Sequence, residues 1–252
     1  MQEFPRTTVG GVSLSRMLIG TNWLLGWSHT SASADAQIKR RYDSAQAFKP
    51  VLEAYLRHGV DSIMAPFGAS PELMEAIRDT EQKMGREILL IDTPTLNVDD
   101  NPQARREAEQ TVKESAKRGA KFCLLHHSCA EQLVDKNKGV IRRLDDYTKM
   151  IRDAGMIPGL SAHMPELIVY SDANGYDVET YIQIFNCMGF LMQVEIETVA
   201  SIIQNAKKPV MTIKSMAAGR CSPYVGLTFS WNAIREKDMV TVGAFSPQEA
   251  EE

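Results

Sequence analysis

Polar side chains that can do chemistry stand at the ends of several apolar runs in the sequence. His126 and His127 follow one such run, His163 ends the next, and Lys214 ends a later one. An imidazole can transfer protons near neutral pH. A lysine amine can hold an anionic group or, when its pKa is lowered, form a Schiff base with a carbonyl carbon. These residue types therefore predict proton transfer on a small polar molecule, provided that the fold brings them together.

The elements that would have to position these residues alternate along the chain. Eight apolar runs are predicted as strands: Arg16–Thr21, Asp61–Pro66, Glu87–Asp92, Lys121–His127, Ile157–His163, Glu179–Phe185, Pro209–Lys214 and Met239–Ala244. Stretches with helical spacing or helix caps lie between them: Phe48–His58, Ser70–Gly85, Gln103–Arg118, Lys138–Ala154, a turn from Pro165, Glu195–Ala206, Tyr224–Arg235 and a short final helix capped by Ser246. Strands and helices in this order predict parallel pairing with crossover helices.

A closed (β/α)8 TIM barrel, forming a single domain over residues 1–252, is the predicted fold. A length of 252 residues is near the ~250 that is typical of such barrels. The alternative is an open doubly wound sheet, which usually carries a glycine-rich G-x-G-x-x-G turn after its first strand. The segment Gly20–Trp23 does not match that turn. In a barrel, the carboxyl ends of all eight strands meet at one rim, where such folds keep their chemistry.

Composition and charge restrict the kinds of partner. The chain is 44% hydrophobic with a net charge of −4, so no broad basic surface argues for nucleic acid or an anionic membrane. No apolar run approaches the ~18 residues of a membrane span, and the N-terminus lacks a signal pattern. The four scattered cysteines are expected to be reduced thiols, which predicts a cytoplasmic protein. A small-molecule substrate is the expected partner, and a homo-oligomer is left open.

Four segments resemble the aldo-keto reductases, in the order in which that family has them. Leu14–Trp23 resembles the opening strand, and Leu124–His126 resembles the fourth strand, which ends in a catalytic histidine. Gly159–Leu167 resembles the fifth strand and the next helix, and Val242–Glu249 resembles the segment that holds a cofactor phosphate. The resemblance implies a TIM barrel, a catalytic role for His126, and an NAD(P) site that includes Ser246.

The chain departs from that family at the other catalytic positions. The resemblance implies an aspartate and a tyrosine at the second strand and a lysine at the end of the third. The matching stretches are Ile63–Ser70, which has neither an aspartate nor a tyrosine, and Ile91–Pro94, which has no lysine. Reduction of a ketone needs a proton donor beside the carbonyl oxygen. The sequence therefore favours the fold of the family over its reductase activity. A divalent metal is a possible cofactor, and NAD(P) is expected less than the metal.

The predicted catalytic group consists of Asp92, His126, His163 and Lys214, all at strand ends. Because side chains alternate along a strand, only one of His126 and His127 is expected to point into the mouth; the family resemblance favours His126. The two histidines could bind a divalent metal with a carboxylate such as Glu195, or with Asp92 or Glu179. They could equally act as acid–base groups, or be hydrogen-bonded parts of an inert rim.

Substrate contacts are predicted from the loops that follow the strands. Trp23, Trp27 and His29 lie in a long polar and aromatic segment after the first strand, where an indole can pack on the apolar face of a sugar. Asn186 begins a possible flap after the sixth strand, and Arg220 could hold a phosphate or carboxylate.

Three functions follow from these observations. The favoured one is an enzyme that isomerises, epimerises or eliminates on a small polar substrate of the sugar or keto-sugar kind, by acid–base or metal-assisted chemistry. The second is an NAD(P)H-dependent oxidoreductase with a divergent site. The third is a non-catalytic barrel that binds a ligand.

Overall fold

The barrel closes in the computed structural model, which describes residues 3–252. Eight parallel strands form its wall: β3 (Met17–Gly20), β4 (Ser62–Ala65), β5 (Leu89–Asp92), β6 (Phe122–Leu125), β9 (Ile157–Ala162), β10 (Tyr181–Ile184), β11 (Val210–Ile213) and β12 (Met239–Val242). Each strand pairs with the next one in the wall, and β12 pairs with β3 to close the ring. The predicted (β/α)8 barrel is confirmed, including the sixth strand, observed at β10.

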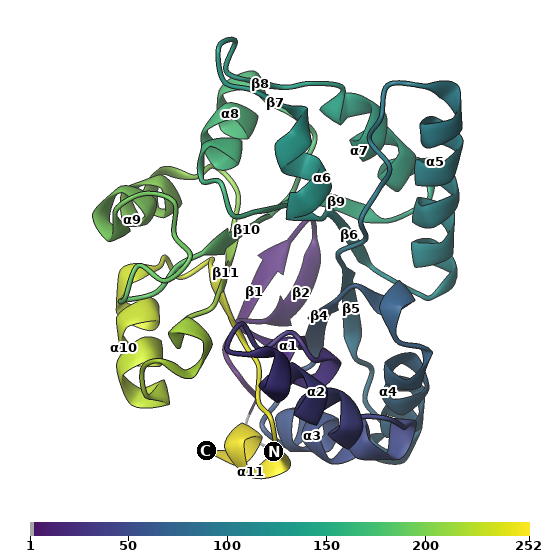
Figure 1. Ribbon diagram of the computed structural model, residues 1–252, viewed down its shortest axis with the longest axis vertical. Helices are drawn as coiled ribbons and strands as arrows, with labels where there is room; N and C mark the ends of the chain where they lie inside the picture. The colour runs from purple at the N-terminus through teal and green to yellow at the C-terminus, as the bar shows by residue number, and fades with distance from the viewer. Residues whose placement is uncertain (1–2) are drawn as a thin grey trace.

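Helices surround the ring of strands (Figure 1). They are α1 (Asn22–Leu25), α2 (Ala32–Arg41), α3 (Ala45–Arg57), α4 (Pro71–Met84), α5 (Pro102–Lys117), α6 (His127–Ala130), α7 (Leu144–Asp153), α8 (Glu166–Asn174), α9 (Ile196–Asn205), α10 (Pro223–Ala233) and α11 (Pro247–Glu251). Three 3₁₀ turns lie at η1 (Phe67–Ala69), η2 (Glu131–Leu133) and η3 (Ala217–Gly219). Within residues 3–252, no helix combines the length and the apolar character needed to span a membrane.

Alternation along the strands separates the inside of the barrel from its outer surface. The inner cluster holds one or more apolar side chains from every wall strand, for example Leu18 of β3, Ile91 of β5 and Leu124 of β6. The residues beside them in sequence face the helices, as Ile19 and Leu125 do. The direction of any polar residue near a strand end can be read from this parity.

An N-terminal hairpin closes one end of the barrel. Strands β1 (Arg6–Val9) and β2 (Val12–Ser15) pair in antiparallel fashion, and Val9 and Leu14 belong to the inner cluster. The turn uses Gly10, whose φ is +53° and where a Cβ would lie 2.9 Å from the Ile157 side chain. Figure 1 shows the hairpin across the middle of the ring, and the opposite end is left for the site.

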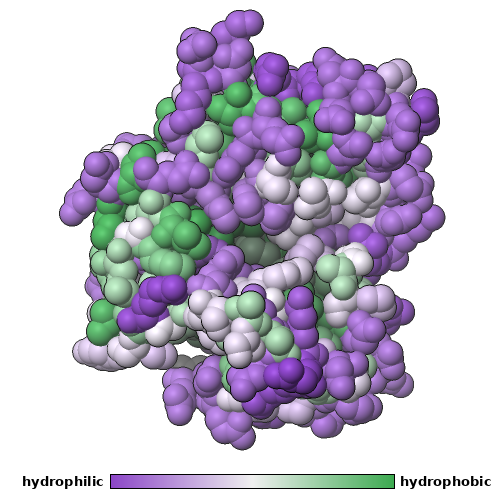
Figure 2. Space-filling view, viewed as in Figure 1, coloured by the Kyte–Doolittle hydropathy of each residue, from purple (hydrophilic) through white to green (hydrophobic). Residues whose placement is uncertain are grey.

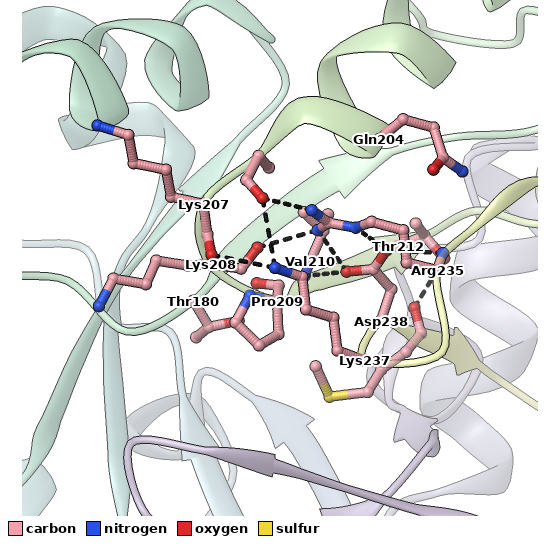
Figure 3. Close-up of polar contacts among 12 residues, drawn as sticks. Thr180, Gln204, Lys207, Lys208, Pro209, Val210, Thr212, Arg235, Lys237 and Asp238 are labelled. Carbon is pink, nitrogen blue, oxygen red and sulfur yellow. Dashed lines mark hydrogen bonds and ion pairs between the residues drawn. The ribbon is translucent and has the colours of Figure 1, made fainter.

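A buried ion pair fixes the start of β11, the strand that leads to Lys214 (Figure 3). The Asp238 carboxylate accepts hydrogen bonds from the Val210 amide at 2.8 Å and from the Arg235 amide and side chain at 2.9 and 2.8 Å. Arg235 also donates to the Lys208 carbonyl at 3.0 Å. Asp238 is fully buried, so its charge needs these partners. The network lies at the end of the strand remote from Lys214.

Two segments differ from the sequence-based expectation. The long segment after β3 is largely helical, since α1 and α2 lie within it; Ser31 caps α2 by accepting a hydrogen bond from the Ala34 amide. The helix expected from Lys138 begins only at Leu144, because a small hairpin precedes it: β7 (Val134–Asp135) with β8 (Val140–Ile141). A hairpin of two-residue strands is too short to leave a periodic pattern in the sequence.

Candidate active site

A cavity of about 530 Å³ opens at the carboxyl ends of the strands. Figure 2 shows the surface hollowed near the middle of this face. Its lining includes most of the chemically active side chains that the sequence singled out: Trp23, Trp27, His29, His126, His163 and Lys214. Residues from the first, fourth, fifth and seventh wall strands and their loops thus meet in one place, as the closed barrel requires.

Both adjacent histidines line the cavity, so the expectation that only one would do so is wrong. His126 directly follows β6 and lies two residues after Leu124, whose side chain faces the barrel interior, so alternation directs His126 to the same side. The strand ends at Leu125, and His127 is already the first residue of α6, where alternation no longer applies. The two ring centroids lie 4.2 Å apart.

His163 completes a run of three imidazoles. Its ring stacks on that of His127, with 3.7 Å between the centroids and 17° between the planes. Glu131 fixes the backbone at this point, because its carboxylate accepts from the amides of His163 and Met164 at 2.6 and 2.9 Å. Within residues 3–252 the rings of His127 and His163 have no hydrogen-bond partner, so their nitrogens are free for a substrate.

Burial keeps these imidazoles neutral. It lowers the pKa of His163 to about 3 and that of His126 to about 4, with further lowering by His127 and Lys214. Burial also lowers the pKa of His127. Nδ1 of His126 lies 2.8 Å from the Ser128 hydroxyl and 3.4 Å from the Ser128 amide. The amide N–H can only donate, so we assign Nδ1 as the acceptor of both groups and the proton of the neutral ring to Nε2. The site therefore holds imidazoles that can accept a proton at pH 7, and one, His126, that presents an N–H.

Lys214 is paired with His29 instead of with a carboxylate. Its Nζ lies 3.1 Å from Nε2 of His29, and the Asn22 amide nitrogen lies 3.1 Å from the same ring atom. Burial lowers the pKa of Lys214 to about 8. Among the described residues, Lys214 is the one Lys or Arg that lines the cavity, and no Asp, Glu or Tyr lines it.

The loop that carries His29 is held from two sides. Asp35 of α2 accepts from the amide and the hydroxyl of Ser28 at 2.7 and 2.6 Å. Arg220 donates to the His29 carbonyl at 3.3 Å, and its guanidinium lies 3.9 Å from the centroid of the Phe190 ring. Arg220 was predicted to bind substrate, but it does not line the cavity. Its guanidinium contacts the loop that carries His29 instead.

Two hydroxyls in the lining were missed by the sequence analysis. Ser215 and Thr241 are 1% and 9% exposed, and their oxygens have no hydrogen-bond partner within residues 3–252. A buried hydroxyl without a partner is costly unless a ligand or water satisfies it. The direction of Thr241 could have been predicted from the sequence, because it lies two residues after Met239, whose side chain faces the barrel interior. Ser215 follows the strand end at Lys214 and had no such signal.

Asp92 does not belong to the cavity, and its predicted place at the mouth is wrong. Ile91 faces the barrel interior, so Asp92 faces the helices. Its carboxylate is fully buried, accepts from the Ser115 hydroxyl at 2.6 Å and the Phe67 amide at 3.2 Å, and pairs with Arg118 at 3.4 Å. These contacts tie β5 to α5.

Three further predicted positions also lie outside the lining. Asn186 is buried and shapes its own loop, accepting from the Met188 and Phe190 amides. Glu195 is exposed at the start of α9 and does not join His126 and His163. Ser246 caps α11 by accepting from the Glu249 amide at 3.2 Å. In the part of the chain from residue 3 onward, no group of three or more His, Cys, Asp or Glu side chains could hold a metal ion.

Comparison with known proteins supports the fold. No protein-family model matches the sequence, and no curated protein matches it significantly. A Pseudomonas aeruginosa protein assigned to the aldo-keto reductases has a TM-score of 0.67 at 13% identity, covering 99% of this chain and 94% of that chain. A thermostable aldo-keto reductase in complex with the inhibitor epalrestat has a TM-score of 0.59 at 12% identity, covering 97% and 92%.

A barrel enzyme of a different class is also similar. Orotidine 5′-monophosphate decarboxylase of Methanocaldococcus jannaschii has a TM-score of 0.54 at 17% identity, covering 93% of this chain and 94% of that chain. These likenesses confirm the predicted aldo-keto reductase-like TIM barrel. Barrels of this shape carry many unrelated reactions, so function has to be argued from the site.

Proposed function

We propose that this protein is an enzyme that moves a proton on a small polar carbonyl compound of the keto-sugar kind, in an isomerisation, epimerisation or elimination. One observation carries the proposal: His126, His127 and His163 line one cavity, with His127 in ring contact with each of the other two, and burial lowers the pKa of all three. A neutral imidazole can act as a general base when it is positioned beside the proton, and positioned proton transfer contributes roughly 10²–10⁴ in rate.

The three rings suit different parts of a proton transfer. His127 and His163 have no hydrogen-bond partner in the described chain, so either can accept a proton from the carbon beside a carbonyl. His126, with its proton on Nε2, can donate to the carbonyl oxygen as negative charge develops there. The ammonium of Lys214 can stabilise the same charge.

The lining also fits a small hydroxylated molecule. A cavity of about 530 Å³ is within the range of small-molecule sites. The unpartnered hydroxyls of Ser215 and Thr241 can bind substrate oxygens, and Trp23 and Trp27 offer ring faces to an apolar sugar surface.

The two alternatives have less support from the residues of the cavity. A reductase of the aldo-keto type would need a proton donor such as tyrosine, and no tyrosine of the described chain lines the cavity. A ligand-binding protein without activity does not explain why three imidazoles are gathered in one cavity and two of them, His127 and His163, have no hydrogen-bond partner in the described chain.

Hydrogen–deuterium exchange tests the proposal without knowledge of the product. The protein is incubated in D₂O with dihydroxyacetone, ketohexoses and 2-keto acids, and loss of the proton signal beside the carbonyl is followed by ¹H NMR. We expect exchange with at least one compound, and a fall of roughly 10²-fold in His163→Asn. His58→Gln is the matched control, since His58 lies outside the cavity and pairs with Glu251.

Two results would contradict the proposal: no exchange with any compound, or full exchange in variants of all three cavity histidines. Each assay is repeated after EDTA treatment and with added Mg²⁺, Mn²⁺ or Zn²⁺. A strict requirement for one ion would shift the mechanism from acid–base to metal-assisted chemistry.

A further inference from the structure

We propose that the amine of Lys214 forms a covalent imine with the carbonyl carbon of the substrate, and that His29 takes the proton which the amine must lose. The inference deepens the proposed function by giving the cavity a nucleophile in addition to its acid–base groups. It also narrows the substrate to an aldehyde or an unhindered ketone.

The pairing of Lys214 with an imidazole is the first support. Nε2 of His29 lies 3.1 Å from Nζ, and the Asn22 amide nitrogen, which can only donate, lies 3.1 Å from the same ring atom. Nε2 is therefore an acceptor, with the ring proton on Nδ1, and it is placed to receive a proton from an ammonium. A carboxylate in this position would have held the lysine in its charged form.

Backbone strain at both residues is the second support. His29 has φ 57° and Lys214 has φ 62°, in the left-handed region that non-glycine residues seldom adopt. Ala217 and Ala218, in the same loop as Lys214, have φ 50° and 56°. Such strain destabilises the folded chain and collects at functional sites. The chain holds both members of the pair in place at a cost to its stability.

The surroundings of Lys214 raise the neutral fraction of its amine. Burial lowers its pKa to about 8, and the groups that face it are the imidazoles of His29, His126, His127 and His163. Among the described residues, no carboxylate lines the cavity to offset the charge. An appreciable fraction of the amine is then unprotonated near neutral pH, as nucleophilic attack requires.

The covalent step balances without a further reactant. His29 takes one proton from the ammonium of Lys214. The neutral amine then attacks the carbonyl carbon, so that the C–N bond forms as the C=O π bond breaks, and the extra proton on nitrogen passes to the oxygen to give a carbinolamine. The proton held by His29 returns to the hydroxyl, the C–O bond breaks, and water leaves to give the protonated imine. This cation withdraws electrons from the neighbouring carbon, so that its proton can pass to the imidazole of His127 or His163. Hydrolysis of the imine returns the lysine.

Reductive trapping tests the imine directly. The protein is incubated at pH 7 with dihydroxyacetone, glycolaldehyde or pyruvate and sodium cyanoborohydride, and modified lysines are located by mass spectrometry. We expect Lys214 to be alkylated at least tenfold faster than Lys138, an exposed lysine of the same chain. Equal or slower modification with all three probes would overturn the imine.

The role of His29 has its own readout. In His29→Leu, trapping at Lys214 should fall about tenfold at pH 7 and recover at pH 9, where the amine is already neutral. An equal loss at both pH values would mean that His29 only shapes the loop, and unchanged trapping at pH 7 would remove it from the proposal. Circular dichroism of each variant checks that the barrel is folded.

Lys214→Arg separates a nucleophile from a simple anion-binding cation. It keeps the positive charge and cannot form an imine, so exchange at the carbon beside the carbonyl should be lost; undiminished exchange would overturn the covalent role.

The imine and the proton transfer can also fail separately. Exchange without trapping leaves the histidine chemistry and rejects the imine, whereas trapping without exchange leaves the imine and rejects the proposed proton transfer.

Discussion

The imidazole of His127 lies flat against that of His163, with 3.7 Å between the ring centroids. At this distance, two protonated rings would repel each other strongly, so at most one of them can carry a charge. Once one ring accepts a proton, the other is held in the neutral form. The relationship follows from the end of β6 at Leu125, after which His127 begins α6 and lies against His163, the residue that follows the neighbouring strand β9.

The first prediction concerns acid stability. Because the pKa of His163 is lowered to about 3, the unfolded chain binds a proton that the folded chain does not bind, between about pH 6.5 and pH 3. The free energy of unfolding should therefore fall as the pH is lowered through this window. His163→Phe keeps a ring in the stack and removes the titrating nitrogen. Urea unfolding at pH 7 and pH 4.5 should show a smaller loss in the variant than in the wild type.

The second prediction concerns the stability cost of Lys214. Its pKa is lowered to about 8, so the folded state carries a buried charge below pH 8, and the penalty disappears above the ordinary lysine pKa of about 10.4. Lys214→Met should raise the free energy of unfolding at pH 7 by about 1–3 kcal/mol. The gain should shrink as the pH rises from 8 toward 10.5. A variant less stable than the wild type at pH 7 would show that burial does not oppose the charge.

The barrel could be predicted from the sequence because every wall strand is a short apolar run between helix signals. Side chains along these runs alternate between the barrel interior and the helices, and this alternation decides which polar side chains face the cavity. That parity gives His126 correctly from Leu124, and it would have excluded Asp92, which lies beside the inward Ile91.

The rest of the site depends on loops, where parity does not apply. The contact between His29 and Lys214 joins residues 185 positions apart and exists only because β3 and β11 flank β12 in the closed ring. The orientation of Asn186 is set by amides of its own loop, and nothing in the sequence distinguishes this from a side chain that faces a ligand.

The third prediction separates structure from catalysis at Asp92. Its buried carboxylate binds the Ser115 hydroxyl, the Phe67 amide and the Arg118 guanidinium. Asp92→Ala should lower the free energy of unfolding by about 3 kcal/mol, because Arg118 and Ser115 lose their buried partner. The folded fraction should keep its exchange activity, measured per folded molecule below the melting temperature. A loss of activity without a loss of stability would return Asp92 to the catalytic group.

The last prediction concerns Arg220, which joins the loop after β11 to the loop that carries His29. Its guanidinium donates to the carbonyls of Ala217 and His29 at 3.1 and 3.3 Å, and its flat face lies on the Phe190 ring. Lysine has neither the fork of donors nor the planar group, so Arg220→Lys should behave like Arg220→Ala. In both variants we expect trapping at Lys214 at pH 7 to fall severalfold, because His29 is no longer held at 3.1 Å from the amine.

If Arg220 instead bound an anionic substrate, Arg220→Lys would restore most of the function, and only the KM of anionic compounds would rise. Trapping rates with neutral dihydroxyacetone and anionic pyruvate, measured side by side in the two variants, decide between these roles.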